Sequence, residues 1–153
     1  MNLIPSSDTV IGLGGVSWGI AEDGHKYGEV RGDCEGIKYV CDWVNDDQPY
    51  TIKMKNGELV SVPYALELND TPLHIVHIHG SSELYRRARD QFEVLYREGK
   101  TNGRIMATAV HPYITGVPHR IKYFDRLFNY ISRFEGVLYM RGADIHDWYK
   151  RRT

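Results

Sequence analysis

The sequence of 153 residues predicts an α/β protein with a single domain. In the C-terminal half, short apolar runs alternate with longer segments of helical periodicity, an order typical of a parallel sheet or a barrel segment. No internal repeat or low-complexity linker divides the chain. We therefore expect one domain over residues 1–153, with an irregular arm over 1–35 and the ordered part over 36–150.

Glycines interrupt the arm throughout, and no helical or alternating period persists in it. The string Gly12-Leu13-Gly14-Gly15 lacks the register and the following amphipathic helix of a phosphate-binding loop. We expect a meandering loop, or an arm that docks outside the core.

The first regular elements are extended. Residues 36–43 are rich in β-branched and aromatic side chains and predict a strand. Residues 50–62 predict a β-hairpin, because Asn56-Gly57 lies between two alternating arms.

Helices and strands alternate from residue 81 onward. Apolar residues recur at helical spacing from residue 84 to a stop at Gly99, and again over 118–134. Between and after these helices lie the apolar runs 105–110 and 137–140, followed by a last helix over 145–150.

His111 follows the run 105–110 directly and is followed by a proline, which ends the strand. Chemistry in α/β proteins is usually placed at the carboxyl ends of parallel strands. A functional histidine and a histidine that caps a strand by hydrogen bonding to backbone are equally compatible with this position.

Two further clusters contain groups capable of chemistry. Asp42, Asp46 and Asp47 could bind a cation or a donor-rich ligand, although an acidic, turn-forming loop is the favoured interpretation. The imidazoles of His74, His77 and His79 are weak candidates for a zinc site. A pocket wall or a flank of the next helix is favoured for them, because alternate residues of an extended segment face opposite ways.

Composition excludes some classes of partner. The net charge of −1 and the absence of a basic block predict no nucleic-acid partner, and no apolar run is long enough for a membrane span. The N-terminus lacks the features of a signal peptide, and Cys34 and Cys41 are expected to be reduced thiols. We therefore expect a cytoplasmic protein.

Five strings resemble, in order, the polysaccharide deacetylase family, in its allantoinase-like and peptidoglycan-deacetylase-like subgroup. Residues 36–50, GIKYVCDWVNDDQPY, are similar to its fourth conserved block, and residues 106–121, with His111-Pro112, to its last catalytic block. The other three strings are residues 62–70, 90–96 and 144–149.

The resemblance implies a distorted (β/α) barrel, present here only as its C-terminal half and therefore partial. It also implies hydrolysis of C–N bonds in N-acetylated sugars or small cyclic amides, with His111 as the general acid. Asp42 and Trp43 would orient this acid and form the wall of the groove. Other substrate-binding candidates within the matched strings are Asp46, Asp47, Tyr64 and Arg120.

The family's metal ligands, an aspartate and two histidines in a His-x-x-x-His block, have no counterpart here; the first histidine is His25 and the next is His74. We therefore expect a protein that is inactive alone, with a divalent metal such as zinc only if a complementing half or a rebuilt site exists. Unpaired sheet edges predict a homo-oligomer, such as a dimer, or pairing with an N-terminal half. The alternatives are a non-catalytic module that binds a sugar or small amide, and an independent metallohydrolase built on the histidines.

Overall fold

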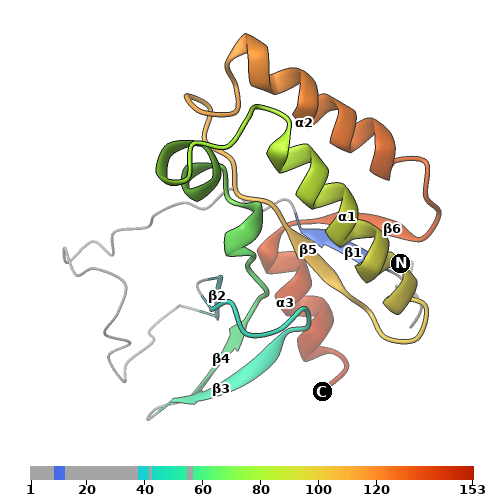
Figure 1. Cartoon of the computed structure of the whole chain (residues 1–153). Helices are drawn as coiled ribbons and strands as arrows, with labels where there is room; N and C mark the ends of the chain where they lie inside the picture. The colour runs from blue at the N-terminus through green and yellow to red at the C-terminus, as the bar shows by residue number, and fades with distance from the viewer. Residues whose placement is uncertain (1–8, 13–37, 42, 55–56) are drawn as a thin grey trace.

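The computed structural model describes residues 9–12, 38–41, 43–54 and 57–153 (Figure 1). Its first sheet is parallel and has the order β5-β1-β6, formed by β5 (Ile105–Ala107), β1 (Thr9–Gly12) and β6 (Val137–Met140). Val10 pairs with both Ile105 and Leu138. The mixed α/β class and the strand expected at 137–140 are confirmed, whereas the apolar run 105–110 forms a strand over Ile105–Ala107 only.

The central strand β1 comes from the segment that we expected to be irregular, so that expectation is wrong for residues 9–12. A strand of four residues is too short for a visible period, and only pairing with two distant strands reveals it. Residues 1–8 and 13–35 of the expected arm lie outside the described residues.

The second sheet contains the predicted hairpin. Antiparallel strands β3 (Tyr50–Met54) and β4 (Gly57–Ser61) pair from Tyr50↔Ser61 to Met54↔Gly57, and Gly57 has a φ of +124°, which a residue with a side chain rarely adopts. Strand β2 (Tyr39–Val40) pairs in parallel with β4. It lies within the expected strand 36–43, of which residues 36, 37 and 42 lie outside the described residues.

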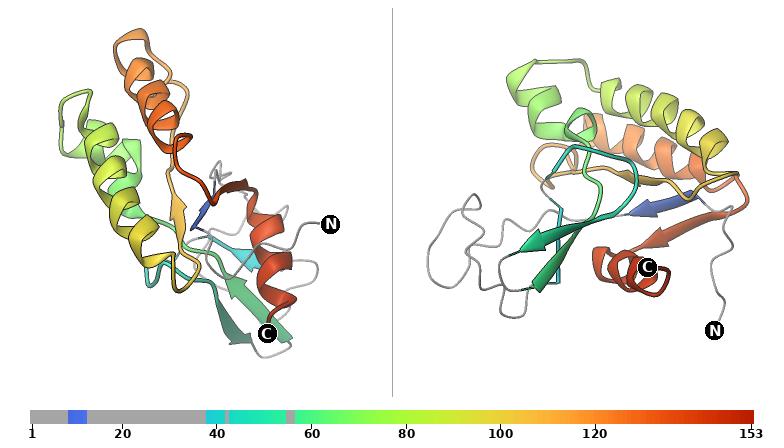
Figure 2. Two further views of the ribbon diagram at one scale, coloured as in Figure 1. Left: turned by 90° about the vertical axis from the view of Figure 1, so that its right-hand side faces the viewer. Right: turned by 90° about the horizontal axis from the view of Figure 1, so that it is seen from below.

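Two amphipathic helices, α1 (Glu83–Glu98) and α2 (Pro118–Ile131), confirm the predicted periodicity and pack together around Phe92, which is fully buried. The third helix, α3 (Gly142–Lys150), begins three residues earlier than expected and buries Ile145. In both views of Figure 2, α1 and α2 lie on one side of β5, β1 and β6, while α3 lies on the other side. None of the helices in the described part of the chain is both long and apolar enough to cross a membrane.

Two short helical turns, η1 (Leu66–Leu68) and η2 (Pro72–Val76), connect the hairpin to α1. An isolated parallel bridge joins Asn69, between these turns, to Ala109, beyond the end of β5. This bridge aligns the chain before η2 with the chain after β5.

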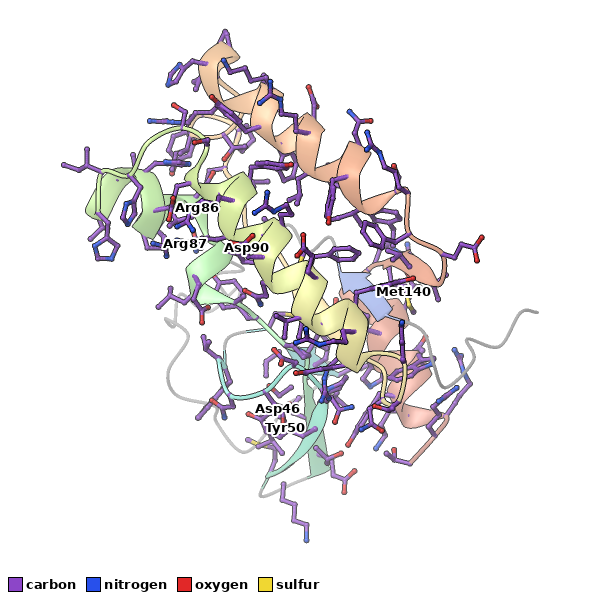
Figure 3. The ribbon with its side chains drawn as sticks, turned by 45° about the vertical axis from the view of Figure 1, so that its right-hand side comes forward. Asp46, Tyr50, Arg86, Arg87, Asp90 and Met140 are labelled. Carbon is purple, nitrogen blue, oxygen red and sulfur yellow. The ribbon has the colours of Figure 1, made fainter. Side chains whose placement is uncertain are left out.

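The exposed face of α1 is charged, as predicted. Its first residue, Glu83, accepts hydrogen bonds from Arg86 Nη2 and Arg87 Nε, both at 2.7 Å. These bonds lower the pKa of Glu83 from 4.5 to about 2, and the bond from Arg86 makes the largest contribution. Figure 3 shows Arg86, Arg87 and Asp90 on this helix.

The lowered pKa of Glu83 makes a pH-dependent contribution to stability. Since the unfolded chain takes up this proton at a higher pH, the contribution is complete above pH 4.5 and is lost as the pH falls toward about 2. We expect Glu83→Gln to reduce the free energy of unfolding by about 1 kcal/mol at pH 7, a value discounted for solvent screening. Urea unfolding at pH 7, 4 and 3 should show the difference from wild type shrinking at low pH. Glu135→Gln, at an exposed residue, is the control, and a difference independent of pH would contradict the prediction.

Candidate active site

The backbone brings His111 beside Asp70. Ala109 N donates to Leu68 O at 3.0 Å, and Asp70 N donates to Ala109 O at 3.1 Å. Residues 68–70 and 109–111 therefore run side by side, beyond the carboxyl end of β5. The predicted position of His111 at a strand's carboxyl end is confirmed, and the pairing adds an aspartate to it.

Asp70 is fully buried, and its two carboxylate oxygens accept three hydrogen bonds. Oδ2 accepts from His111 N at 2.7 Å and from Thr115 Oγ1 at 2.6 Å. Oδ1 lies 2.7 Å from His111 Nδ1. A buried charge needs such partners, and charge-assisted bonds of this length are the strong kind.

This contact orients the His111 ring. Because a carboxylate only accepts, the ring proton facing Asp70 is assigned to Nδ1, which leaves Nε2 on the opposite side of the imidazole. Thr71 Oγ1 also lies 3.2 Å from Nδ1. The His111 side chain is 21% exposed, so a proton can be exchanged at the surface. An imidazole held by a buried carboxylate is suited to general acid–base chemistry.

Asp70 is a functional candidate that the sequence reasoning missed. The family resemblance implied the orienting role for Asp42, which lies outside the described residues. Asp70 is the last residue of the string 62–70, two residues before η2, and its place in that string was the available signal. Its partner is 41 residues away, so only the tertiary structure identifies the pair.

Two other predicted residues lie close to the dyad of Asp70 and His111. The Tyr64 hydroxyl accepts a hydrogen bond from Asn69 Nδ2, and Asn69 Oδ1 in turn accepts from Thr71 N at 2.9 Å. Arg120 Nη1 donates to Ile114 O at 3.1 Å, and its Nε is buried without a hydrogen-bond partner. Arg120 also lines a small pocket together with Thr115 and the buried His74.

The acidic loop lies at the other end of β5. Ile105, the first residue of β5, donates its N–H to Asp47 O at 2.9 Å. His111 is six residues further on, about 20 Å away at the rise of an extended chain. The structure therefore does not bring Asp46 and Asp47 together with His111, and Figure 3 shows Asp46 beside Tyr50 and the hairpin.

Within this loop the residues act locally. Asp46 Oδ1 accepts the Gln48 N–H at 3.1 Å, as expected of a turn-forming aspartate. Burial raises the pKa of Asp47, while Arg104 opposes the shift. The Trp43 side chain is about half exposed.

The three histidines do not gather around one point. His74 is buried in η2, where its Nδ1 lies 3.2 Å from His79 O, and His79 Nε2 lies 3.2 Å from Arg87 Nη2. His77 is exposed. Over residues 9–12, 38–41, 43–54 and 57–153, no group of three or more His, Cys, Asp or Glu side chains is arranged to hold a metal ion. The rings of His77 and His79 lie 6.0 Å apart beyond the end of η2, whereas His74 lies within it.

Comparison with known proteins supports the resemblance. No protein-family model matches the chain. A putative polysaccharide deacetylase of Schizosaccharomyces pombe is 36% identical over 107 residues, which cover 63% of this chain and 33% of that protein. In sequence, the chain is therefore similar to a polysaccharide deacetylase. It spans about a third of the length of this curated relative.

Solved structures agree. A probable polysaccharide deacetylase from Pseudomonas aeruginosa PAO1 matches with a TM-score of 0.68 and 27% identity, over 74% of this chain and 39% of that one. PuuE allantoinase matches with a TM-score of 0.73 and 27% identity, over 78% of this chain and 41% of that one. A putative polysaccharide deacetylase from Mycobacterium smegmatis, at 16% identity and a TM-score of 0.63, shares the fold over 74% of this chain and 41% of its own.

The buried carboxylate of Asp70 should be essential for stability. Asp70→Ala leaves the His111 N–H and the Thr115 hydroxyl without their acceptor, so we expect a loss of about 2–4 kcal/mol in the free energy of unfolding. Urea unfolding at pH 7 measures it. Asp46→Ala, which removes one surface acceptor, should cost less than about 1 kcal/mol, and equal losses for both variants would contradict the assignment.

Proposed function

We propose that this chain supplies the proton-transfer part of a hydrolase that acts on non-peptide C–N bonds. The bonds would be those of N-acetyl groups on carbohydrates or of small cyclic amides. One observation carries the proposal: a chain similar in sequence to a polysaccharide deacetylase, and in structure to an allantoinase, pairs a partly exposed histidine with a fully buried aspartate.

The chemistry of the dyad suits the step that breaks such a bond. After water adds to the carbonyl carbon, the nitrogen must gain a proton before it can leave as an amine. His111 Nε2 gives this proton as the C–N bond breaks, and Asp70 stabilises the ring while it carries positive charge. The products are the amine and a carboxylic acid.

The activation of water is a separate task. The described residues do not fit a metal site, so we derive no step of the reaction through a metal ion. We propose that the chain is inactive alone and works with a complementing half or as a homo-oligomer. Two features support this: the chain spans 39% and 41% of its first two structural neighbours, and among the described residues β6 is paired on one side only.

A second candidate function is a non-catalytic module that binds a sugar or small amide. It is favoured by Tyr113, whose side chain is 74% exposed and whose ring lies 5.5 Å from the His111 ring. An exposed aromatic ring beside a polar group offers a stacking surface to a ring-shaped ligand.

A chimera tests the proposed function. Residues 57–153 would replace the matching segment of the Pseudomonas aeruginosa protein, and hydrolysis of N-acetylated chitooligosaccharides would be followed by release of acetate. We expect turnover with the wild-type segment and a loss of about 100-fold or more with His111→Ala. His119→Ala, at an exposed histidine, is the matched control.

A loss below about threefold for His111→Ala would return this residue to a structural role. A folded wild-type chimera without turnover on either chitooligosaccharides or allantoin would overturn the proposed function.

Binding by the unmodified chain separates the second candidate from the first. Titration with chitooligosaccharides, followed by NMR, should give saturable shifts at His111 and Tyr113 with no acetate released if the chain is a binding module. Tyr113→Ala should then weaken binding about fivefold or more, the loss expected for one aromatic contact. Tyr139→Ala, at another exposed tyrosine, should leave the affinity unchanged, and equal effects of both variants would exclude the stacking role.

A further inference from the structure

The hydroxyl of Thr115 reaches the one carboxylate oxygen of Asp70 that does not face the ring. Thr115 is 4% exposed and donates to Asp70 Oδ2 at 2.6 Å. His111 N donates to the same oxygen at 2.7 Å, whereas the ring nitrogen Nδ1 faces Oδ1. Oδ1 therefore faces the imidazole ring, whereas Oδ2 accepts the two hydrogen bonds from the turn after β5.

The turn after His111 aims this hydroxyl. Ile114 N and Thr115 N both donate to His111 O at 2.9 Å, and Gly116 N donates to Pro112 O at 3.0 Å. The turn is tight, since a Cβ on Gly116 would lie 2.3 Å from Pro112 O. Thr115 is thus held at a fixed distance from His111 by backbone bonds, and its side chain meets the carboxylate that orients the ring.

The physical consequence concerns rotation of the carboxylate. The terminal torsion of an aspartate is broad and twofold, so a carboxylate with a single donor can turn and exchange its oxygens. Two donors on Oδ2, both attached to the same turn, oppose this rotation. Oδ1 then stays in line with Nδ1, and the proton of the neutral imidazole stays on Nδ1 rather than on Nε2.

We propose that Thr115 is a positioning residue, which acts through Asp70 to hold the His111 ring in the orientation and tautomer needed for proton transfer. The role of Thr115 in proton transfer rests on the proposed function, whereas its effect on the His111 ring does not. The competing role is purely structural: Thr115 would then do no more than satisfy a buried carboxylate.

Histidine NMR of the unmodified chain distinguishes these roles, because imidazole ¹⁵N shifts report which ring nitrogen carries the proton. Thr115→Val keeps the shape and removes the donor, and Thr115→Ser restores it. Thr108→Val is the matched control, because Thr108 is 6% exposed and makes no hydrogen bond to Asp70 or His111.

In wild type and in Thr115→Ser we expect the neutral ring to carry its proton on Nδ1. In Thr115→Val we expect a mixture of both tautomers, together with exchange of the His111 amide proton that is faster by about tenfold or more. Thr108→Val should preserve the wild-type tautomer and change exchange by less than about twofold. If Thr115→Val does not fold, Thr115→Cys, which keeps a weak S–H donor, should show the same changes to a smaller degree.

An unchanged tautomer in the folded Thr115→Val or Thr115→Cys protein would overturn the inference. Faster exchange that is equal at the Phe92 amide of α1 would also overturn it, since this would report global loss of stability. The chimera adds an independent readout, in which Thr115→Val lowers kcat with little change in KM. Lack of turnover in the wild-type chimera would refute the proposed function. The tautomer measured by NMR would still decide whether Thr115 orients the His111 ring.

Discussion

The site depends on one pairing, in which residues 68–70 run beside residues 109–111. This pairing places the Asp70 carboxylate inside the protein at the point where His111 begins the next turn. A buried carboxylate is costly unless its oxygens are satisfied, and here a backbone N–H, a ring nitrogen and a hydroxyl satisfy them. Stability and the orientation of the candidate acid therefore have the same physical origin.

The two ends of β5 have different characters. Its amino end is covered by the loop of Asp46 and Asp47, which forms turns and accepts backbone hydrogen bonds. Its carboxyl end leads to His111. Tyr64 is hydrogen-bonded to Asn69, next to Asp70, and Arg120 donates to Ile114, whose N–H donates to His111 O. Of the predicted substrate-binding residues, Asp46 and Asp47 thus lie at the amino end of β5, and Tyr64 and Arg120 lie near its carboxyl end.

The helices and the hairpin were predictable because their signals are local. The apolar stripe of α1 and the Asn56-Gly57 hairpin signal in the sequence depend on residues that are close together. Strand β1 was not predictable, because its four residues become a strand only between β5 and β6. For the same reason Asp70 was not predicted: the sequence shows a carboxylate there but not that its partner is His111, 41 residues away.

By itself, the sequence determined the α/β class, the helix α1, the hairpin, the resemblance to polysaccharide deacetylases and the choice of His111 as a candidate functional residue. These follow from residue periodicity, turn chemistry and the order of similar strings. Only the tertiary structure decided which carboxylate holds His111, that His74, His77 and His79 form no metal-binding group within the described residues, and that Thr115 donates to the same carboxylate. Such contacts join residues about 40 positions apart, and their geometry is set by strand pairing and burial, which no local pattern encodes.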